Sequence, residues 1–213
     1  MNEERYDWDD RFDFSTGVVA FHWSVSRELD ALNTHNVFMS AKSSEDAEQS
    51  WSVLRSNDGN DPKDLIDQPF NFYVHRAGKT DSTAAPPGCD AIMVLVPCHT
   101  LQHSAELSSL PRDEAINTYK QQFDEGVVSF IRQAVFARLA VLEGLKDLQK
   151  YILDEVLDTP GTYADHFNLG AGVPFGLVSQ VFCILFVVLS LAEVTHRIRF
   201  QHTESRLGSV EPD

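Results

Sequence analysis

Residues 70–96 read FNFYVHRAGKTDSTAAPPGCDAIMVLV, and this stretch decides the fold class. Its first part, Phe70 to His75, alternates aromatic and polar residues, which predicts a β-strand. Gly78 to Gly88 is rich in Pro and Gly, which punctuate the backbone, so a loop is predicted there. Ala91 to Val96 is a continuous apolar run, which predicts a strand buried on both faces. The stretch therefore predicts two strands joined by a long loop.

The sequence on either side adds strands and one long helix. Apolar residues recur every three or four positions from Phe123 to Leu142, which predicts one helix over Arg112 to Leu142, ended by Gly144. Thr159 and Pro160 predict the start of a second helix. Further strands are predicted at Val18 to Val25, Asn36 to Met39 and Tyr151 to Leu157, and a polar helix at Ser43 to Gln49. Strands that are mixed with helices in this way predict an α+β fold.

Length, charge and cysteine content exclude several classes of protein. The 213 residues suit one domain, or one domain plus an appendage. A net charge of -15 argues against nucleic acid as a main partner, because phosphate binding needs clustered Lys and Arg. The three cysteines show no CxxC spacing, so the sequence predicts neither a disulfide framework nor a zinc site. The acidic first residues lack the apolar core of a secretory signal, so an intracellular location is expected.

One uncharged run of 17 residues, GLVSQVFCILFVVLSLA at 176–192, has two interpretations. A membrane-spanning helix needs about 20 apolar residues, so this run lies at the lower limit of that class. The basic residues His196, Arg197 and Arg199 follow it, as they would at a cytoplasmic membrane end. The other interpretation is a buried core helix or a pair of strands.

Few residues suggest chemistry on their own. His99 and His103 are four positions apart, but no third ligand accompanies them, so the sequence predicts no metal site. Gly170, Gly172 and Gly176 do not have the spacing of a dinucleotide fingerprint, which favours a plain turn over a flavin site. The aromatic residues of the predicted strands either line an apolar cavity or belong to the core.

Three segments, taken in order, carry a family resemblance. The first is Phe21-His22-Trp23-Ser24-x-x-Arg27, followed by Leu32-x-x-His35-Asn36-Val37-Phe38. The second runs from Asn71-Phe72-Tyr73-Val74 through Asp81, Ala84-Ala85-Pro86-x-Gly88-x-Asp90 to Val94-Leu95-Val96-Pro97. The third is Thr159-Pro160, Phe167-Asn168-Leu169, Gly172 and Phe175-Gly176-Leu177. Together they resemble the fungal-type phytoene desaturases, over about residues 14–179.

The resemblance implies a flavoprotein oxidoreductase of carotenoid biosynthesis. In it, this region would form the mixed β-sheet substrate domain, preceded by an unmatched acidic leader at 1–13 and followed by a divergent segment and tail at 180–213. The family desaturates a linear C40 polyene, phytoene or a related carotenoid, with FAD as acceptor, at the cytosolic face of a membrane. We expect Phe21, Trp23, Phe72 and Val94 to line the substrate tunnel. No catalytic residue of the family maps clearly onto this chain, so the catalytic residues stay unknown.

The chain also departs from the family pattern. The N-terminal G-x-G-x-x-G and the C-terminal flavin-binding stretch of the family are both missing from this sequence. We therefore expect a fragment that binds no FAD alone and is inactive alone, so its status as an enzyme stays open. Two other hypotheses remain: a non-catalytic membrane-associated protein anchored by 176–192, and a carrier of apolar ligands.

Overall fold

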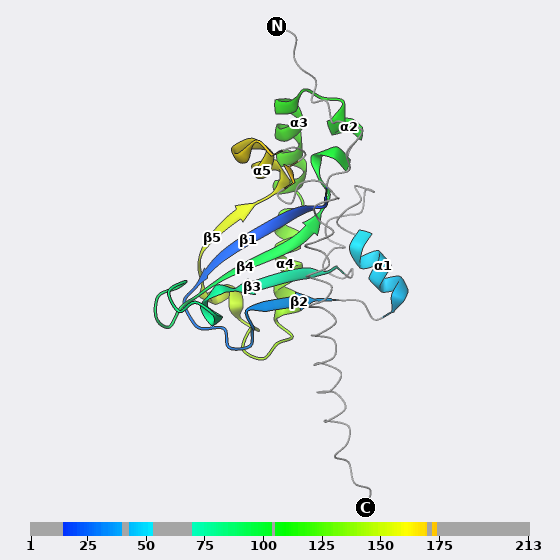
Figure 1. The fold of residues 1–213 in the computed structure, drawn as a ribbon. Helices are drawn as coiled ribbons and strands as arrows, with labels where there is room; N and C mark the ends of the chain where they lie inside the picture. The colour runs from blue at the N-terminus through cyan, green and yellow to red at the C-terminus, as the bar shows by residue number, and fades with distance from the viewer. Residues whose placement is uncertain (1–14, 40–42, 53–69, 104, 170–171, 174–213) are drawn as a thin grey trace, which may run out of the picture.

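Five β-strands form one antiparallel sheet in the computed structural model, which describes residues 15–39, 43–52, 70–103, 105–169 and 172–173. The strands are β1 (Gly17–Val25), β2 (His35–Phe38), β3 (Phe72–Arg76), β4 (Asp90–Cys98) and β5 (Ile152–Asp158). Their order across the sheet is β2-β3-β4-β1-β5, so β1 lies between β4 and β5 (Figure 1). This sheet and its helices confirm the predicted α+β class.

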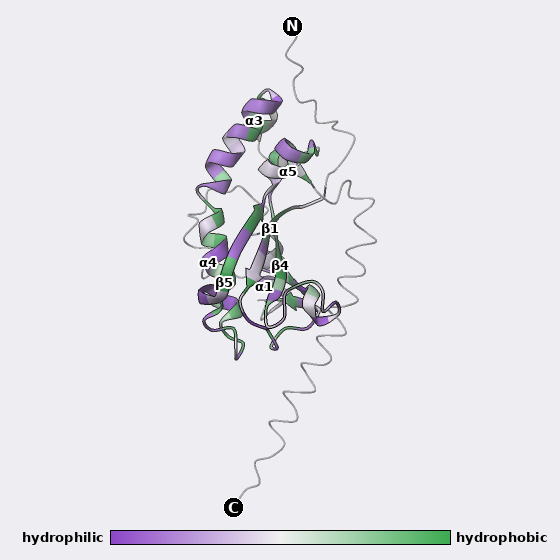
Figure 2. Cartoon of the chain, turned by 90° about the vertical axis from the view of Figure 1, so that its left-hand side faces the viewer, coloured by the Kyte–Doolittle hydropathy of each residue, from purple (hydrophilic) through white to green (hydrophobic). Residues whose placement is uncertain are grey.

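Helices gather behind the sheet and at one of its ends. The helices are α1 (Ser44–Ser52), α2 (Ala105–Ser108), α3 (Arg112–Tyr119), α4 (Val128–Leu139) and α5 (Pro160–Phe167). Short 3-10 turns occur at Ala77–Lys79, Leu101–His103 and Leu148–Tyr151. Figures 1 and 2 show α4 along one face of the sheet, with α3 and α5 beyond the end where β5 stops. No described helix lies in front of the middle of the sheet in Figure 1.

The core lies between the sheet and α4. On the sheet side, the two central strands contribute side chains that are 0–3% exposed: Val19, Phe21, Trp23 and Val25 of β1, and Ile92, Val94 and Val96 of β4. On the helix side, the buried residues are Val128, Ile131, Ala134, Val135 and Leu139. Burial of this apolar surface stabilises the fold at about 25 cal/mol per Å².

The prediction of one helix over Arg112 to Leu142 is wrong in its continuity. The chain forms α3, then a π-helical turn at Lys120–Asp124, and only then α4. A Cβ at Gly126 would lie 2.5 Å from the carbonyl oxygen of Gln122, so the backbone packs too closely there for a side chain. The apolar spacing survives this break because the π-turn keeps Phe123 on the buried side together with the buried positions of α4.

Gly144 does not end α4, although the sequence predicted that it would. The helix stops at Leu139, and Gly144 lies in the following turns with a φ of 89°. Left-handed backbone of this kind favours glycine. The residue therefore marks a turn between α4 and β5, rather than the cap of the helix.

The interpretation of Ala91 to Val96 as a strand buried on both faces is also wrong. Side chains of β4 alternate strictly between buried and half-buried along its nine residues. The buried set faces α4, whereas the half-buried set faces the other side of the sheet, where no described helix covers the middle. The sheet is therefore covered on one face only among its described elements.

Helix α5 begins as the sequence predicted. The Thr159 hydroxyl accepts a hydrogen bond from the Thr162 amide at 3.2 Å, and the Thr162 hydroxyl accepts one from the Thr159 amide at 2.6 Å. This capping box, with Pro160 in the first turn, satisfies backbone donors that a helix start leaves without partners. Asn168 ends the helix in the left-handed conformation, with a φ of 51°.

A buried ion pair closes the base of the β3–β4 hairpin. Nε of Arg76 donates a hydrogen bond to Oδ2 of Asp90 at 2.6 Å, and the side chains are 6% and 1% exposed. The same oxygen accepts the backbone N–H of Leu29 at 2.9 Å, and Nη1 of Arg76 donates to the Leu32 carbonyl at 3.3 Å. This pair therefore ties the long loop to the segment that follows β1.

Several predicted segments lie outside the described residues. They are the leader 1–13, the apolar run 176–192 and the tail that follows it. Within the described ranges, none of the helices has the length and apolar character that crossing a membrane requires. The division of the chain at residues 13 and 179 stays a prediction.

Candidate functional site

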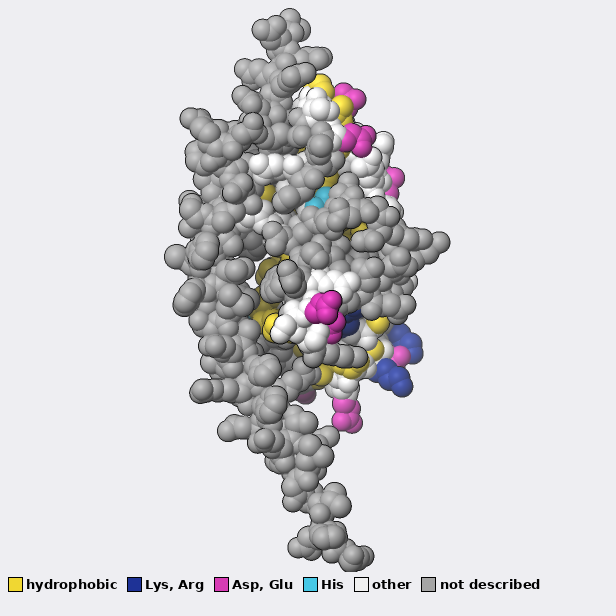
Figure 3. All heavy atoms as spheres, turned by 90° about the vertical axis from the view of Figure 1, so that its right-hand side faces the viewer, with side chains coloured by type: hydrophobic (Ala, Val, Ile, Leu, Met, Phe, Trp, Pro, Cys, Tyr) yellow, Lys and Arg dark blue, Asp and Glu magenta, His cyan; other side chains and the backbone are white. Residues whose placement is uncertain are grey.

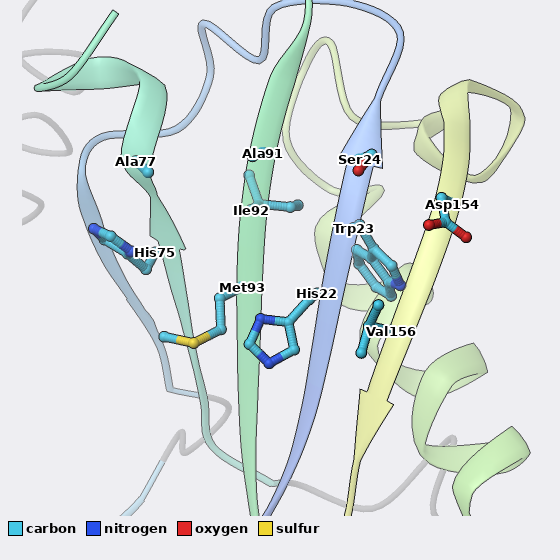
Figure 4. Close-up of a pocket in the computed structure, with 10 residues that line it drawn as sticks. All are labelled: His22, Trp23, Ser24, His75, Ala77, Ala91, Ile92, Met93, Asp154 and Val156. Atoms are coloured by element: carbon cyan, nitrogen blue, oxygen red, sulfur yellow. The ribbon is translucent and has the colours of Figure 1, made fainter. Parts of the chain in front are cut away.

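A shallow pocket of about 320 Å³ lies on the face of the sheet that α4 does not cover. Figure 4 shows its lining, which comes from four neighbouring strands and the turn after β3. The side chains that the pleat directs to this face are His75, Ala77, Ala91, Met93, His22, Ser24, Asp154 and Val156. We call this surface the open face.

Strand register arranges the open face in rows that cross the strands. The central row runs His35, His75, Met93, His22 and Val156, each residue directly opposite the next on the neighbouring strand. Such cross-strand neighbours have Cβ atoms about 4.5–5.5 Å apart, so the row is continuous. An apolar thioether thus lies between two imidazoles, as Figure 4 shows.

A second row of smaller side chains borders the first. Ser24 lies opposite Ala91 on one side and opposite Asp154 on the other, and Ala77 follows directly after β3. Because alanine and serine are short, the sheet is hollowed between the larger side chains of the central row and the loop end of the strands.

Histidines supply two of the four polar side chains of the open face, and His35 continues the central row beyond it. Nε2 of His22 lies 3.4 Å from Oδ2 of Asp158, and Nδ1 of His35 lies 2.5 Å from the Tyr73 hydroxyl. The ring of His75 stacks on that of His35 with centroids 5.3 Å apart. Burial, and then the charge of His35, lower the pKa of His75 below its usual value. His75 therefore favours the neutral imidazole, which can both donate and accept a hydrogen bond.

The four residues that the resemblance predicted as substrate lining lie on the covered face. Phe21, Trp23, Phe72 and Val94 are each between 0 and 2% exposed and belong to the core beneath the sheet. Of the four, Trp23 also borders the pocket on the open face. The structure therefore brings these residues together as core neighbours, and their contact with a substrate stays a prediction.

Trp23 is fixed by two direct partners, one of which is held in turn by Arg132. Its ring stacks on Phe136 with centroids 4.8 Å apart and an angle of 11° between the planes. Its Nε1 donates to Oε2 of Glu155 at 2.6 Å, and Arg132 holds the same carboxylate through two further hydrogen bonds of 2.9 and 2.5 Å. These contacts join β1, β5 and α4 directly under the pocket.

Three residues of the open face, which the sequence analysis did not select, lie directly beside residues that it predicted as substrate lining. His22 and Ser24 flank Trp23, and Met93 precedes Val94. Successive side chains of a strand point to opposite faces, so the aromatic residues predicted as substrate lining belong to the core face instead. The polar residues at alternate positions of Val18 to Val25 were the signal that could have found them.

The histidine pair after β4 does not form a metal site in the described residues. The His99 ring packs edge-on against Tyr119 and Phe123, with centroids 5.3 and 4.7 Å apart. No group of three or more His, Cys, Asp or Glu side chains within the described ranges could hold a metal ion. The aromatic packing gives His99 a structural role.

A half-buried carboxylate lies where the π-helical turn meets α5. Oδ2 of Asp124 accepts a hydrogen bond from the Thr159 hydroxyl at 3.0 Å, whereas Oδ1 is buried and has no hydrogen-bond partner among the described residues. Burial raises the pKa of Asp124 to about 6. The folded chain therefore keeps Asp124 neutral up to about pH 6, well above the pH at which an ordinary aspartate ionises.

This shift predicts an unusual dependence of stability on pH. Because the folded state binds the Asp124 proton more tightly than the unfolded chain does, the free energy of unfolding should fall as pH rises from about 4 to about 6. Solvent reaches part of this side chain, so we expect a contribution of about 1–2 kcal/mol. Asp124→Asn should remove it, raising stability at neutral pH but not at pH 4, as measured by urea unfolding across pH. Equal pH dependence in the variant and the wild type would contradict this assignment.

The described charged side chains on one face of the molecule form no extended basic surface (Figure 3). In the face drawn in Figure 3, the described Lys and Arg side chains gather in one small region, whereas acidic side chains are spread along the molecule. Nucleic acid binding needs an extended basic surface. Nothing on this described face offers one.

Known proteins with similar sequences are carotenoid desaturases. A phytoene desaturase of Fusarium fujikuroi is 31% identical over 176 residues, which cover 80% of this chain and 29% of that protein. A phytoene desaturase of Neurospora crassa is 31% identical over 172 residues, which cover 80% of this chain and 25% of the relative. A 4,4'-diapophytoene desaturase (4,4'-diaponeurosporene-forming) of Staphylococcus aureus is 24% identical over 108 residues, 51% of this chain and 19% of the relative.

Two further facts describe the extent of this sequence similarity. No protein-family profile matches the sequence. The chain spans less than a third of the length of the curated relatives that it matches.

Proposed function

Because this chain is phytoene-desaturase-like over about four fifths of its length, we propose that it takes part in the desaturation of a linear carotenoid, phytoene or a related polyene. We further propose that the open face, and in particular the row through Met93, contacts the polyene. The observation that carries this proposal is a one-sided sheet with a pocket whose centre is a thioether between two imidazoles.

The chemistry of the pocket supports an unsaturated ligand. Met93 and Val156 offer polarizable and apolar surface, and thioethers make favourable contacts with π-systems. The strands hold these side chains at fixed spacing. A rigid polyene can therefore lie across several strands without the entropic cost of ordering these side chains on binding. An apolar ligand of this class also favours an enzyme that works at a membrane surface, which we include in the proposal.

FAD is the hydride acceptor that we propose for the reaction, bound by residues other than those described. A dinucleotide pyrophosphate needs a strand, a glycine loop and a helix start with amide groups directed at it. All described strands are antiparallel, and the Gly172 amide already donates to the Leu169 carbonyl at 3.2 Å. The described residues do not fit the cofactor, so we derive no chemical step through it.

The other two hypotheses receive no comparable support. The relatives are named as desaturases, and none of those cited is named as a carrier or an anchor protein. The membrane-anchor hypothesis depends on 176–192, which lies outside the described residues.

Binding of a conjugated linear C40 polyene to the purified full chain tests the proposal. The polyene is titrated in detergent micelles, and quenching of tryptophan fluorescence reports its approach to Trp23, which borders the pocket. Met93→Asp places a charge at the centre of the row, and we expect it to weaken binding at least about tenfold.

Val141→Asp is the matched control. Val141 is 76% exposed and lies in the turn after α4, away from the pocket, so this variant should bind like the wild type. Unchanged affinity in the Met93 variant, or equal loss in both variants, would remove the open face as the polyene surface.

A further inference from the structure

We infer that residues 194–200 of this chain, VTHRIRF, pair with β5 as a further strand of the sheet. These residues lie outside the part of the chain that the structure describes. The edge that β5 presents, and the match between its side chains and this segment, carry the inference independently of the proposed function.

Strand β5 forms one edge of the described sheet. Among the described strands it pairs only with β1, so alternate backbone groups of β5 point away from the sheet (Figure 1). Its sequence, ILDEVLD, contains neither proline nor lysine, which commonly keep an edge strand from pairing. Leu153 and Val156 are 67% and 56% exposed along it. The edge therefore offers both the backbone groups and the apolar surface that an added strand covers.

The acidic side chains of β5 disfavour a second copy of this chain as the added strand. Two β5 strands that pair antiparallel about their centre place Glu155 opposite Glu155. A shift of the register by two residues places Asp154 opposite Asp154 in one direction and opposite Asp158 in the other. Like charges directly opposite each other destabilise a strand pair. The edge therefore suits a strand that carries basic side chains.

Two arginines of the segment match the acidic side of β5. Asp154, Val156 and Asp158 point to the same side of the sheet as the open face. Arg197 and Arg199 are two positions apart, so both point to one side of an extended strand. With Arg197 opposite Asp158 in an antiparallel pair, Arg199 falls opposite Val156, between the two aspartates. Opposite charges on neighbouring strands stabilise such a pair.

The same register also matches the other side of β5. It places Ile198 opposite Leu157, which packs against the core from the covered face. Four of the seven residues of the segment are of types favoured in strands: Val194, Thr195, Ile198 and Phe200. The segment thus combines basic side chains on one side with apolar side chains on the other, as this edge requires.

The chain is long enough to bring the segment to β5. The last described residues are Gly172 and the buried Val173, and a Cβ at Gly172 would lie 2.0 Å from the carbonyl oxygen of Pro160. Because β5 ends at Asp158, the described chain ends beside that end of the strand. The next 20 residues, 174–193, can span at most about 66 Å, whereas β5 is about 23 Å long. An antiparallel return along β5 is therefore within reach, and the covalent link raises the effective concentration of the segment.

Amide hydrogen exchange of the purified full chain, resolved to single residues by NMR, tests the inference. An edge strand without a neighbour has only alternate amides in hydrogen bonds, so the others exchange fast. We expect slow exchange at consecutive amides of β5 instead. In the variant Arg197→Asp with Arg199→Asp, the amides that point away from β1 should exchange at least about tenfold faster. The amides of β1 report whether the sheet itself stays folded.

A charge swap then locates the contact. Asp154→Arg with Asp158→Arg, added to the arginine variant, restores opposite charges across the edge and should slow the exchange again. Arg206→Asp is the control, since Arg206 lies beyond the segment in the same part of the sequence. This control should exchange like the wild type.

Four outcomes would overturn the inference. Fast exchange at alternate β5 amides of the wild type would show that no strand covers the edge. Protection that the arginine variant retains would assign the edge to another segment, and protection that falls on dilution would assign it to a second copy. Fast exchange that the charge swap leaves unchanged would mean that Arg197 and Arg199 do not face the aspartates of β5.

Discussion

Replacement of Asp90 by alanine is expected to lower the free energy of unfolding by about 3–5 kcal/mol, among the largest effects of any substitution in this chain. The change leaves the guanidinium of Arg76, which is 6% exposed, with only the exposed carboxylate of Asp30, 3.7 Å from Nη1, as a charge partner. It also removes the acceptor for the backbone N–H of Leu29. Urea unfolding followed by tryptophan fluorescence measures the loss.

A second substitution separates the charge pair from the space it fills. Replacing both partners, with Arg76→Met added to Asp90→Ala, should recover part of the loss, because no uncompensated buried charge remains. Asp165→Ala is the surface control, since Asp165 and Lys120 pair at 2.7 Å with side chains that are 46% and 32% exposed. The control should change stability little. A loss in Asp90→Ala no larger than in this control would mean that the pair does not hold the hairpin.

Local patterns in the sequence were enough to place the strands of the sheet. Val18 to Val25 is rich in β-branched and aromatic residues and Phe70 to His75 alternates aromatic and polar residues, and the structure has strands at Gly17–Val25 and Phe72–Arg76. Thr159 and Pro160 likewise placed the start of α5, because a capping box is complete within four residues. Sequence signals that span only a few residues do not depend on the rest of the fold.

The side on which the sheet is covered could not be predicted. Every residue from Ala91 to Val96 is apolar, so the strand carries no internal sign of which face is covered. Coverage depends on where α4 packs, and α4 is about 35 residues further along the chain. The break between α3 and α4 was missed for a related reason, since a π-turn keeps the apolar spacing on one side.

The residues of the candidate site could not be predicted for the same reason. The pocket joins Met93, His22 and Asp154, which are brought together only by the register of β4, β1 and β5. No motif in the sequence contains two of these side chains from different strands. Sequence reasoning reached the right strands but chose their buried neighbours, because large aromatic residues are prominent in composition whether they contact the core or a ligand.

Replacement of Trp23 by alanine tests whether this aromatic residue packs in the core or contacts a ligand. We expect it to lower the free energy of unfolding by about 3–5 kcal/mol. The substitution removes a ring that is 1% exposed, its stack on Phe136 and the donor to Glu155. Trp23→Phe keeps most of the stack and should cost less, because chiefly the hydrogen bond is lost, at about 0.5–1.5 kcal/mol. Val156→Ala on the adjacent strand is the control, since Val156 is 56% exposed on the open face and should change stability by no more than about 0.5 kcal/mol. Urea unfolding of the three variants orders these losses. A Trp23→Ala loss as small as that of Val156→Ala would mean that the indole does not hold the core, and would return Trp23 to the substrate-lining role that the family resemblance predicted.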